Sequence, residues 1–378
     1  MEFSIIFEAE VAHGTREEEQ DVIREGVEQA VLAEQLGFDR FWAVEHHTLE
    51  WYAHMSAPEI FLTFVAARTS RLRVGHGVVC LPFPMNHPIR VAERIAMLDI
   101  LSNGRIDFGA GRGASQQEVG AFGMEQSQTQ AQMEASLHAI PKMWRDDYFE
   151  YHSDVLDIPR RPIRPRPVQK PHPPMFLACT RPETITMAGT YGLGALLLGF
   201  NGPDDIAEKR KRYDDAISAR KPGDLVGEFA NDHISALCPT TVLDDAEEAR
   251  KIGLRGQRFF VESLEHWYGG GPPPDPDRYA DAENLAALLG KEEVTATTFG
   301  HERIEVRTGK RNPNQAYGDA NDTIAYCERL QAAGADEILF LLQMGTIPQS
   351  VVMETIRNIG EKVIPHFRKP AAKVFTPA

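Results

Sequence analysis

The sequence predicts an α/β fold, a TIM (β/α)8 barrel with insertions. Eight apolar, strand-like segments follow one another along the chain, and nearly all are separated by segments with helical spacing. Repeated strand–helix units imply parallel strands, and eight units are the number that closes a barrel. An open, doubly wound sheet stays possible because periodicity does not report closure. The expected strands cover residues 3–8, 39–44, 72–81, 105–110, 175–178, 194–198, 229–238 and 337–342.

The segments between these strands have the starts and stops of helices. Gly37 follows the first helical pattern as a C-cap, and Pro58 suits the first position of the second helix. Asp244 and Asp245 open a long helix where the helix dipole favours acids. The expected helices cover residues 18–36, 58–68, 87–101, 127–144, 181–191, 204–220, 244–267, 320–333 and 349–367.

Two stretches interrupt the alternation. Pro159–Pro174 holds seven prolines among basic residues, which is typical of an extended connector. Gly269–Lys310 opens with GGGPPPDPD and shows no clean period, so we expect a structureless lid or tip there. The chain is therefore expected to be a single barrel domain over residues 1–378, with an insertion or lid at about 269–310.

Composition excludes several kinds of partner. The 378 residues include 40 Lys plus Arg and 55 Asp plus Glu, a net charge of −15, which argues against nucleic acid or an anionic membrane. No apolar run approaches the ~18 residues that span a bilayer, and the start, MEFSIIFEAE, lacks signal-peptide features. Four scattered cysteines (Cys80, Cys179, Cys238 and Cys327) are typical of free thiols in a reducing cytoplasm. We therefore expect a cytoplasmic protein.

Barrel enzymes carry their sites on the loops that follow the strands. Glu45-His46-His47 follows the second strand, and histidine is the natural proton carrier near neutral pH. The alternative is one structural histidine and one exposed histidine. No HExxH or similar spacing exists, so we expect no metal. Gly75-His76-Gly77 ends the third strand, where glycines indicate either a close backbone approach or simple packing.

Two further strand ends favour an anion. Gly111-Arg112-Gly113 follows the fourth strand without the GxGxxG spacing of a dinucleotide fold, and arginine offers a forked donor set for phosphate. Thr180-Arg181-Pro182-Glu183-Thr184 follows the fifth strand. Thr180 and Glu183 resemble a helix-capping box, and free amides at a helix start bind anions. A plain helix start is the alternative.

Together these segments resemble the bacterial luciferase-like flavin monooxygenase family over nearly the whole chain. The resemblance is carried by LGFDRFWAVEHH (36–47), VGHGVVCLPFPMNHPIRVAE (74–93), LDILSNGRIDFGAGRG (98–113) and ACTRPETITMAGTYGLG (178–194). It implies a luciferase-like barrel that uses reduced FMN and dioxygen to oxygenate a small organic substrate through a flavin peroxide.

The resemblance also implies roles for individual residues. His46 matches the family's active-site histidine, with His47 as its partner, and Arg112 matches the arginine that holds the flavin phosphate. Arg181 to Thr184 match the helix start that shares this phosphate, and the segment around His76 and Gly77 matches the one beneath the flavin ring, where a non-prolyl cis peptide is often found. The full set of expected cofactor-binding residues is His76, Gly77, Gly111, Arg112, Thr180, Arg181, Glu183 and Thr184.

Two departures argue against light emission and a long-chain aldehyde substrate. Gly111 stands where the luciferase catalytic subunit has a reactive cysteine, and Thr180 stands where it has a glutamate. We find no nicotinamide site, so reduced FMN is expected from a separate NAD(P)H-dependent flavin reductase. The family also implies a homodimer. A deazaflavin-dependent, hydride-transferring oxidoreductase of the same fold and a non-catalytic flavin-binding protein stay open as alternatives.

Overall fold

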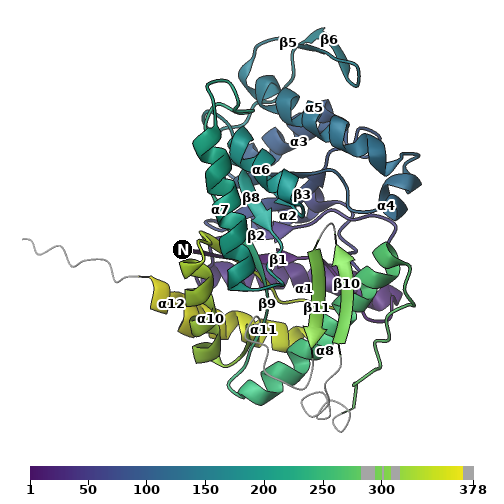
Figure 1. The fold of residues 1–378 in the computed structure, drawn as a ribbon, viewed down its shortest axis with the longest axis vertical. Helices are drawn as coiled ribbons and strands as arrows, with labels where there is room; N and C mark the ends of the chain where they lie inside the picture. Colours follow the sequence, from purple (N-terminus) through teal and green to yellow (C-terminus); the bar gives the residue numbers. More distant parts are fainter. Residues whose placement is uncertain (282–293, 300–301, 308–315, 369–378) are drawn as a thin grey trace, which may run out of the picture.

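The protein folds into a closed barrel of eight parallel strands (Figure 1). The computed structural model describes residues 1–281, 294–299, 302–307 and 316–368. The ring closes where β8 pairs with β9, with Ala195 opposite Ile234. This closure confirms the predicted barrel and excludes the open sheet. In ring order the strands are β1 (Glu2–Phe7), β2 (Arg40–Ala43), β3 (Arg73–Cys80), β4 (Ile106–Gly111), β7 (Met175–Cys179), β8 (Gly194–Leu197), β9 (Ile234–Val242) and β13 (Glu337–Leu341).

Helices connect the strands and cover the outside of the barrel. The first of them begins with a capping box in which Thr15 accepts from the Glu18 amide, and Pro58 opens the second. The helix expected over 349–367 is broken by a π-helical turn, η2 (Ile359–Val363), before α12 (Ile364–Phe367). The main helices are α1 (Arg16–Gln35), α2 (Pro58–Arg68), α3 (Pro88–Leu101), α5 (Gln126–Arg145), α6 (Pro182–Tyr191), α7 (Pro203–Ala219), α8 (Ala246–Leu264), α10 (Ala320–Ala332) and α11 (Gln349–Asn358).

Strand β9 begins at Ile234, although the sequence predicts a strand from residue 229. Phe229 is drawn away from the sheet because its ring stacks on His172, with 4.9 Å between the ring centroids. The His172 ring also accepts a hydrogen bond from the Glu228 amide at 2.9 Å. The apolar character of this segment therefore reflects packing on the proline-rich connector.

Several short elements were not predicted. A hairpin of β5 (Phe149–His152) and β6 (Asp157–Arg161) lies beyond α5, so the connector predicted from residue 159 begins inside a strand. The insertion predicted as structureless contains β10 (Val294–Phe299) and β11 (Glu302–Arg307), an antiparallel pair packed on α8. Residues 282–293, 300–301 and 308–310 of the expected lid lie outside the described residues. The other additions are α4 (Gln116–Ala121), η1 (Glu265–Gly269) and β12 (Ala316–Gly318), which pairs with β9.

Large aromatic side chains fill the barrel. Trp42 is fully buried, and its ring meets the edge of Phe176 with 5.0 Å between centroids. A Cβ at Gly75 would lie 2.2 Å from the Trp42 ring, so the glycine makes room for the indole. The packing alternative for Gly75 is thus confirmed. All four cysteines are buried free thiols, as predicted.

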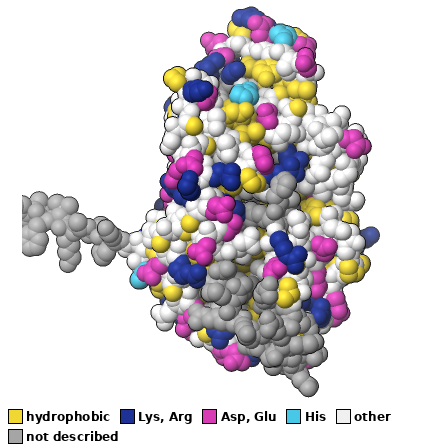
Figure 2. Space-filling model, viewed as in Figure 1, with side chains coloured by type: hydrophobic (Ala, Val, Ile, Leu, Met, Phe, Trp, Pro, Cys, Tyr) yellow, Lys and Arg dark blue, Asp and Glu magenta, His cyan; other side chains and the backbone are white. Residues whose placement is uncertain are grey.

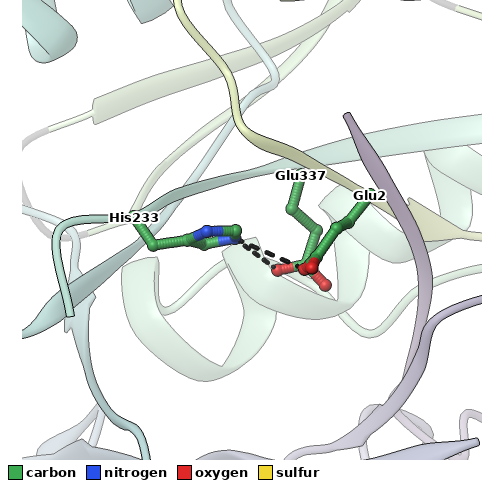
Figure 3. Close-up of side chains that lie close together, drawn as sticks. All are labelled: Glu2, His233 and Glu337. Carbon is green, nitrogen blue, oxygen red and sulfur yellow. Dashed lines mark hydrogen bonds and ion pairs between the residues drawn. The ribbon is translucent and has the colours of Figure 1, made fainter.

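An ion network closes the barrel at the N-terminal ends of its strands (Figure 3). Glu337 is fully buried and accepts from His233 at 3.1 Å, while Glu2 lies 3.9 Å from the same His233 nitrogen. The Arg40 guanidinium lies 2.9 Å from Glu337, 2.6 Å from Glu2 and 2.6 Å from Asp107. The three residues drawn offer metal-ligand atoms within 4.8 Å of one another, yet Arg40 already supplies the compensating charge. The expectation of no metal stays a prediction.

Charges of both signs are interspersed over the face of the molecule shown in Figure 2. No large field of one sign gathers there, although the chain carries a net charge of −15. Within the described ranges, each helix is too short or too polar to span a bilayer.

We predict that Glu337→Gln lowers the free energy of unfolding by about 3 kcal/mol, because it leaves buried Arg40 short of a partner. Burial raises the pKa of Glu337, but Arg40 and His233 overcome this effect and hold the pKa well below its ordinary value. As pH falls, Glu337 is therefore protonated in the unfolded chain before it is protonated in the folded protein. The stability that its charge contributes is lost progressively below about pH 5. Urea unfolding from pH 7 to pH 3 should show a shallower pH dependence in Glu337→Gln than in the exposed control Asp154→Asn. Equal slopes would contradict the role of the network.

Candidate active site

A cavity of about 450 Å³ opens at the C-terminal ends of the barrel strands. Glu8 follows β1, His46 follows β2, Gly111 ends β4 and Thr180 follows β7, and all four line it. The turn η1 and strand β10 contribute the far wall through Trp267, Tyr268 and Thr298. The cavity therefore lies where α/β barrels carry their sites.

The structure brings most of the sequence-predicted site residues to this cavity. Three do not line it: His47 is half-buried beside it, His76 is buried in the barrel wall, and Glu183 is exposed. Those that line it are His46, Gly77, Gly111, Arg112, Thr180, Arg181 and Thr184.

One end of the cavity carries two arginines. Burial and the neighbouring Arg181 both lower the pKa of Arg112, which shows that the two positive groups lie close together. Among the described residues neither forms an ion pair, and the best contact of Arg112 is a 3.5 Å hydrogen bond to the Thr129 hydroxyl. Two adjacent guanidinium groups have the forked donors and the charge that suit a phosphate or similar anion.

The start of α6 lies at the same end. The predicted cap at Thr180 is wrong: the N-cap is Arg181, because Pro182 occupies the first helical position. Glu183 consequently points to solvent and does not complete a capping box with Thr180. The Thr184 hydroxyl lines the cavity and donates to the Arg181 carbonyl at 2.9 Å.

Backbone lies close to the cavity at two glycines. A Cβ at Gly111 would lie 2.5 Å from the Val78 side chain, so any larger residue requires a shift there. The peptide bond between Gly77 and Val78 is cis, in the segment where the family resemblance implies one. Gly111 therefore lets β3 and β4 pack closely where both strands line the cavity.

His46 forms a charged pair with Glu118. Its Nδ1 donates to Glu118 Oε1 at 2.8 Å, and the same carboxylate accepts from the Ser115 hydroxyl and the His47 amide. Burial lowers the pKa of His46, but Glu118 outweighs it and raises the pKa above its ordinary value. Burial likewise raises the pKa of Glu118, and His46 reverses this and lowers it. The contact with Glu118 thus favours the protonated form of His46 at the cavity wall.

Sequence reasoning missed Glu118. The carboxylate lies on the short helix α4, whose N-cap Ser115 accepts from the Glu118 amide. A Ser-x-x-Glu pattern directly after the fourth strand was the available signal, since it is typical of a helix start.

Sequence reasoning also missed Glu8, which follows β1. Its carboxylate is 4% exposed and lies 4.0 Å from His46 Nε2, and Tyr52 hydrogen-bonds to it. The Tyr52 hydroxyl lies 3.3 Å from His46 Nε2. Burial raises the pKa of Glu8 above its ordinary value. This part of the cavity therefore combines an imidazole, a phenol and a buried carboxyl group.

The other predicted histidines have different surroundings. His47 Nε2 lies 3.1 Å from Glu45, which also accepts from the Cys80 amide and from Asn86. Neither ring nitrogen of His76 has a hydrogen-bond partner in the part of the chain that the structure describes, and burial, with Arg94 adding to it, lowers the pKa of His76 to about 3. His76 is thus a neutral ring in the barrel wall, and the roles expected of His47 and His76 stay predictions.

The closed barrel and its strand-end cavity define an α/β-barrel protein whose cavity holds two neighbouring arginines and a histidine paired with a carboxylate. Residues 1–293 match the family model described as luciferase-like monooxygenase, and the chain belongs to this family. It is accordingly an oxidoreductase, a flavin-dependent monooxygenase.

Individual relatives agree with this assignment. The chain is 26% identical over 371 residues to a flavin-dependent trigonelline monooxygenase, oxygenase component, of Acinetobacter baylyi, covering 97% of this chain and 96% of the relative. The solved structure of monooxygenase RslO1 from Streptomyces bottropensis has a TM-score of 0.77 at 24% identity, covering 97% and 100% of the two chains.

The same fold occurs with different cofactors. It is found in a Pseudomonas putida Baeyer-Villiger monooxygenase in complex with FMN, with a TM-score of 0.72 at 18% identity over 98% of this chain and 99% of that one. It is also found in an F420-dependent secondary alcohol dehydrogenase, with a TM-score of 0.70 at 17% identity over 97% and 99%. The fold alone therefore does not decide the cofactor.

We predict that Glu118→Gln lowers the pKa of His46, because it removes the negative charge that stabilises the imidazolium. An NMR titration of the His46 ring in the wild type and the variant measures this change. Glu125→Gln, at the exposed start of α5, serves as the control and should leave the titration unchanged. A His46 pKa that is equal in Glu118→Gln and the wild type would contradict the pairing.

Proposed function

We propose that the protein is the oxygenase of a two-component system that uses reduced FMN and dioxygen to oxygenate a small organic substrate. The choice of FMN as the cofactor rests on the arginine pair, Arg112 and Arg181. This pair lines the cavity and has no counter-ion among the described residues. The phosphate of FMN supplies two negative charges for this pair, and the Thr184 hydroxyl offers a further contact.

The rest of the cavity fits a flat ring system. Gly77 and Gly111 line the cavity along β3 and β4, and apolar side chains such as Leu196 and Leu237 line the barrel mouth beside them. When bound, reduced flavin supplies the electrons that activate dioxygen. The polypeptide binds and orients the flavin, excludes water and supplies protons.

His46 is the proposed acid. Its Nε2 faces Tyr52 and Glu8, while Glu118 holds the opposite ring nitrogen and keeps the ring protonated. Proton transfer by a positioned histidine contributes typically about 10²–10⁴-fold to a rate. His47 is proposed to act less directly: its link to Glu45 holds the loop that positions His46.

The wall formed by η1 and β10 would exclude water from the cavity. Trp267 and Tyr268 line the cavity together with Thr298 of the hairpin. The Trp267 indole donates to the Glu50 carbonyl at 2.8 Å, which ties this wall to the loop after β2. We propose that the described part of the insertion covers the bound flavin, because a dry site suppresses side reactions with water.

The proposed partner is an NAD(P)H-dependent flavin reductase. The name of the Acinetobacter relative describes an oxygenase component, which supports a separate source of reduced flavin. Buried free thiols fit a cytoplasmic location. A deazaflavin-dependent dehydrogenase and a non-catalytic flavin-binding protein are the competing functions. Membership of the luciferase-like monooxygenase family supports the oxygenase over both.

The deciding experiment titrates the protein with FMN, reduced FMN and a deazaflavin, and then follows oxygen uptake. We expect both FMN forms to bind and Arg112→Ala to weaken them about tenfold to a hundredfold, since a charge-assisted hydrogen bond contributes about 1.5–3 kcal/mol. His46→Ala should keep flavin binding and release hydrogen peroxide in place of product, at a cost of at least about tenfold in coupled turnover. Arg212→Ala, an exposed control on α7, should behave as the wild type.

The competing functions give different results in the same assay. Preferential binding of the deazaflavin without oxygen uptake would establish the dehydrogenase. Tight FMN binding with no turnover of any kind would establish the binding protein.

A homodimer is proposed from the apolar surface of two neighbouring helices. α2 and α3 pack against each other and expose large hydrophobic side chains: Ile60 and Phe64 from α2, and Met97, Ile100 and Leu101 from α3. Ile60 is 70% exposed, which is unusual for an isoleucine on a helix. Such a patch is typical of an interface between identical subunits.

We predict that Phe64→Glu converts the dimer into a monomer, because it buries a charge at the centre of this patch. Sedimentation velocity at micromolar concentration measures the change. Val155→Glu, which alters an exposed apolar residue between β5 and β6, should remain dimeric. A wild-type monomer, or a dimer that survives Phe64→Glu, would overturn this interface.

A further inference from the structure

The two ends of the cavity carry different groups. Arg112 and Arg181, which follow β4 and β7, line one end, and Glu8 and His46, which follow β1 and β2, line the other, with Glu118 bonded to His46. The positive charge of His46 is balanced by Glu118 through the 2.8 Å hydrogen bond. Glu8 shares this cation at a longer distance, 4.0 Å from His46 Nε2, and pairs with no other cation among the described residues.

Glu8 is a buried carboxyl group that faces the cavity. It is 4% exposed, and its Oε2 atom has no hydrogen-bond partner among the described residues. An unpartnered buried carboxylate oxygen is costly unless a ligand satisfies it. The structure thus places an unused acceptor at the end of the cavity opposite to the arginine pair.

Aromatic rings surround the same end. Tyr52 and Tyr268 lie with 6.3 Å between their ring centroids, and Trp267 completes the wall. The hydrogen bond from the Trp267 indole to the Glu50 carbonyl holds that ring in place. Aromatic faces attract an organic cation, and tryptophan does so most strongly.

We propose that the Glu8 end of the cavity is a subsite for an organic cation, so that the substrate is a small molecule with a quaternary or pyridinium-type nitrogen. The carboxylate supplies the counter-charge, and Trp267, Tyr52 and Tyr268 supply the aromatic wall. The arginine pair repels the same nitrogen from the other end, which gives the substrate one orientation. The assignment rests on the proposed function only in taking that other end for the flavin phosphate.

Binding of an organic cation would also release the proton of the Glu8 carboxyl group. Burial raises the pKa of Glu8, which favours the protonated form in the free protein. An organic cation replaces that proton, so its binding releases a proton that a neutral ligand does not release. The groups that face Glu8 are His46 and Tyr52 from the loop after β2, Glu118 from α4, Tyr268 from η1 and Glu10 two residues further along.

The test compares N-methylpyridinium with toluene, which has nearly the same shape and no charge. Isothermal titration calorimetry on the full chain, in two buffers of different ionisation enthalpy, measures both affinity and proton release. We expect N-methylpyridinium to bind more tightly than toluene and to release a proton. Glu8→Gln should weaken N-methylpyridinium about tenfold or more, with less than about a twofold change for toluene. The control Glu150→Gln, on exposed β5, should match the wild type.

A second pair of variants avoids changing a buried charge. Trp267→Leu should weaken N-methylpyridinium about fivefold, whereas Trp267→Phe should retain most of the affinity, because only the latter keeps an aromatic face. Equal affinities for the two probes in the wild type, or no selective loss in either Glu8→Gln or Trp267→Leu, would overturn the subsite.

Failure of the subsite and failure of the proposed function are distinguishable. FMN titration depends on Arg112 and is measured without the probes. FMN binding without preference for N-methylpyridinium rejects the cation subsite alone. A preference for N-methylpyridinium that depends on Glu8, in a protein that does not bind FMN, supports the subsite and rejects the flavin function.

Discussion

The pairing of β8 with β9 is the constraint on which the site depends. Closure of the ring forces the ends of eight parallel strands to surround one space, so that residues distant in the sequence become neighbours. The positive charges of Arg112 and Arg181 repel each other, yet the closed barrel holds the two side chains close together. The large buried core, with the ion network around Arg40 at the opposite end, provides the stability that offsets this repulsion.

The cavity separates charge along its length. Its arginine end suits a phosphate, and its other end keeps a proton on His46 by placing Glu118 behind the ring. Burial amplifies both effects because water is not there to screen the charges. One barrel mouth therefore combines a pair of guanidinium groups with a histidine whose protonated form is favoured.

The sequence predicted the barrel, the order of its strands and several residues that line the cavity, because these follow from local patterns along the strands and at their ends. His46 and Arg112 stood out by residue type and position. Glu118 and Glu8 did not, since a chain with 55 acidic residues offers no local sign of which carboxylates become buried. The hairpin of β10 and β11 was missed because its strands follow a stretch of prolines and glycines without apolar alternation. The cap of α6 was misplaced by one residue because Pro182 decides the start of that helix.

The π-helical turn at the end of α8 gives the barrel an adjustable part. It widens one turn just where Trp267 and Tyr268 point into the cavity. Loss of a single residue there would restore ordinary helical winding and swing the residues beyond it by about 100° around the helix axis. Shortening or lengthening the chain at this one point could thus exchange the aromatic ceiling for other side chains and leave all eight strands undisturbed. Insertions and deletions at this turn would then change the lining of the cavity, and with it the reaction, more readily than substitutions would.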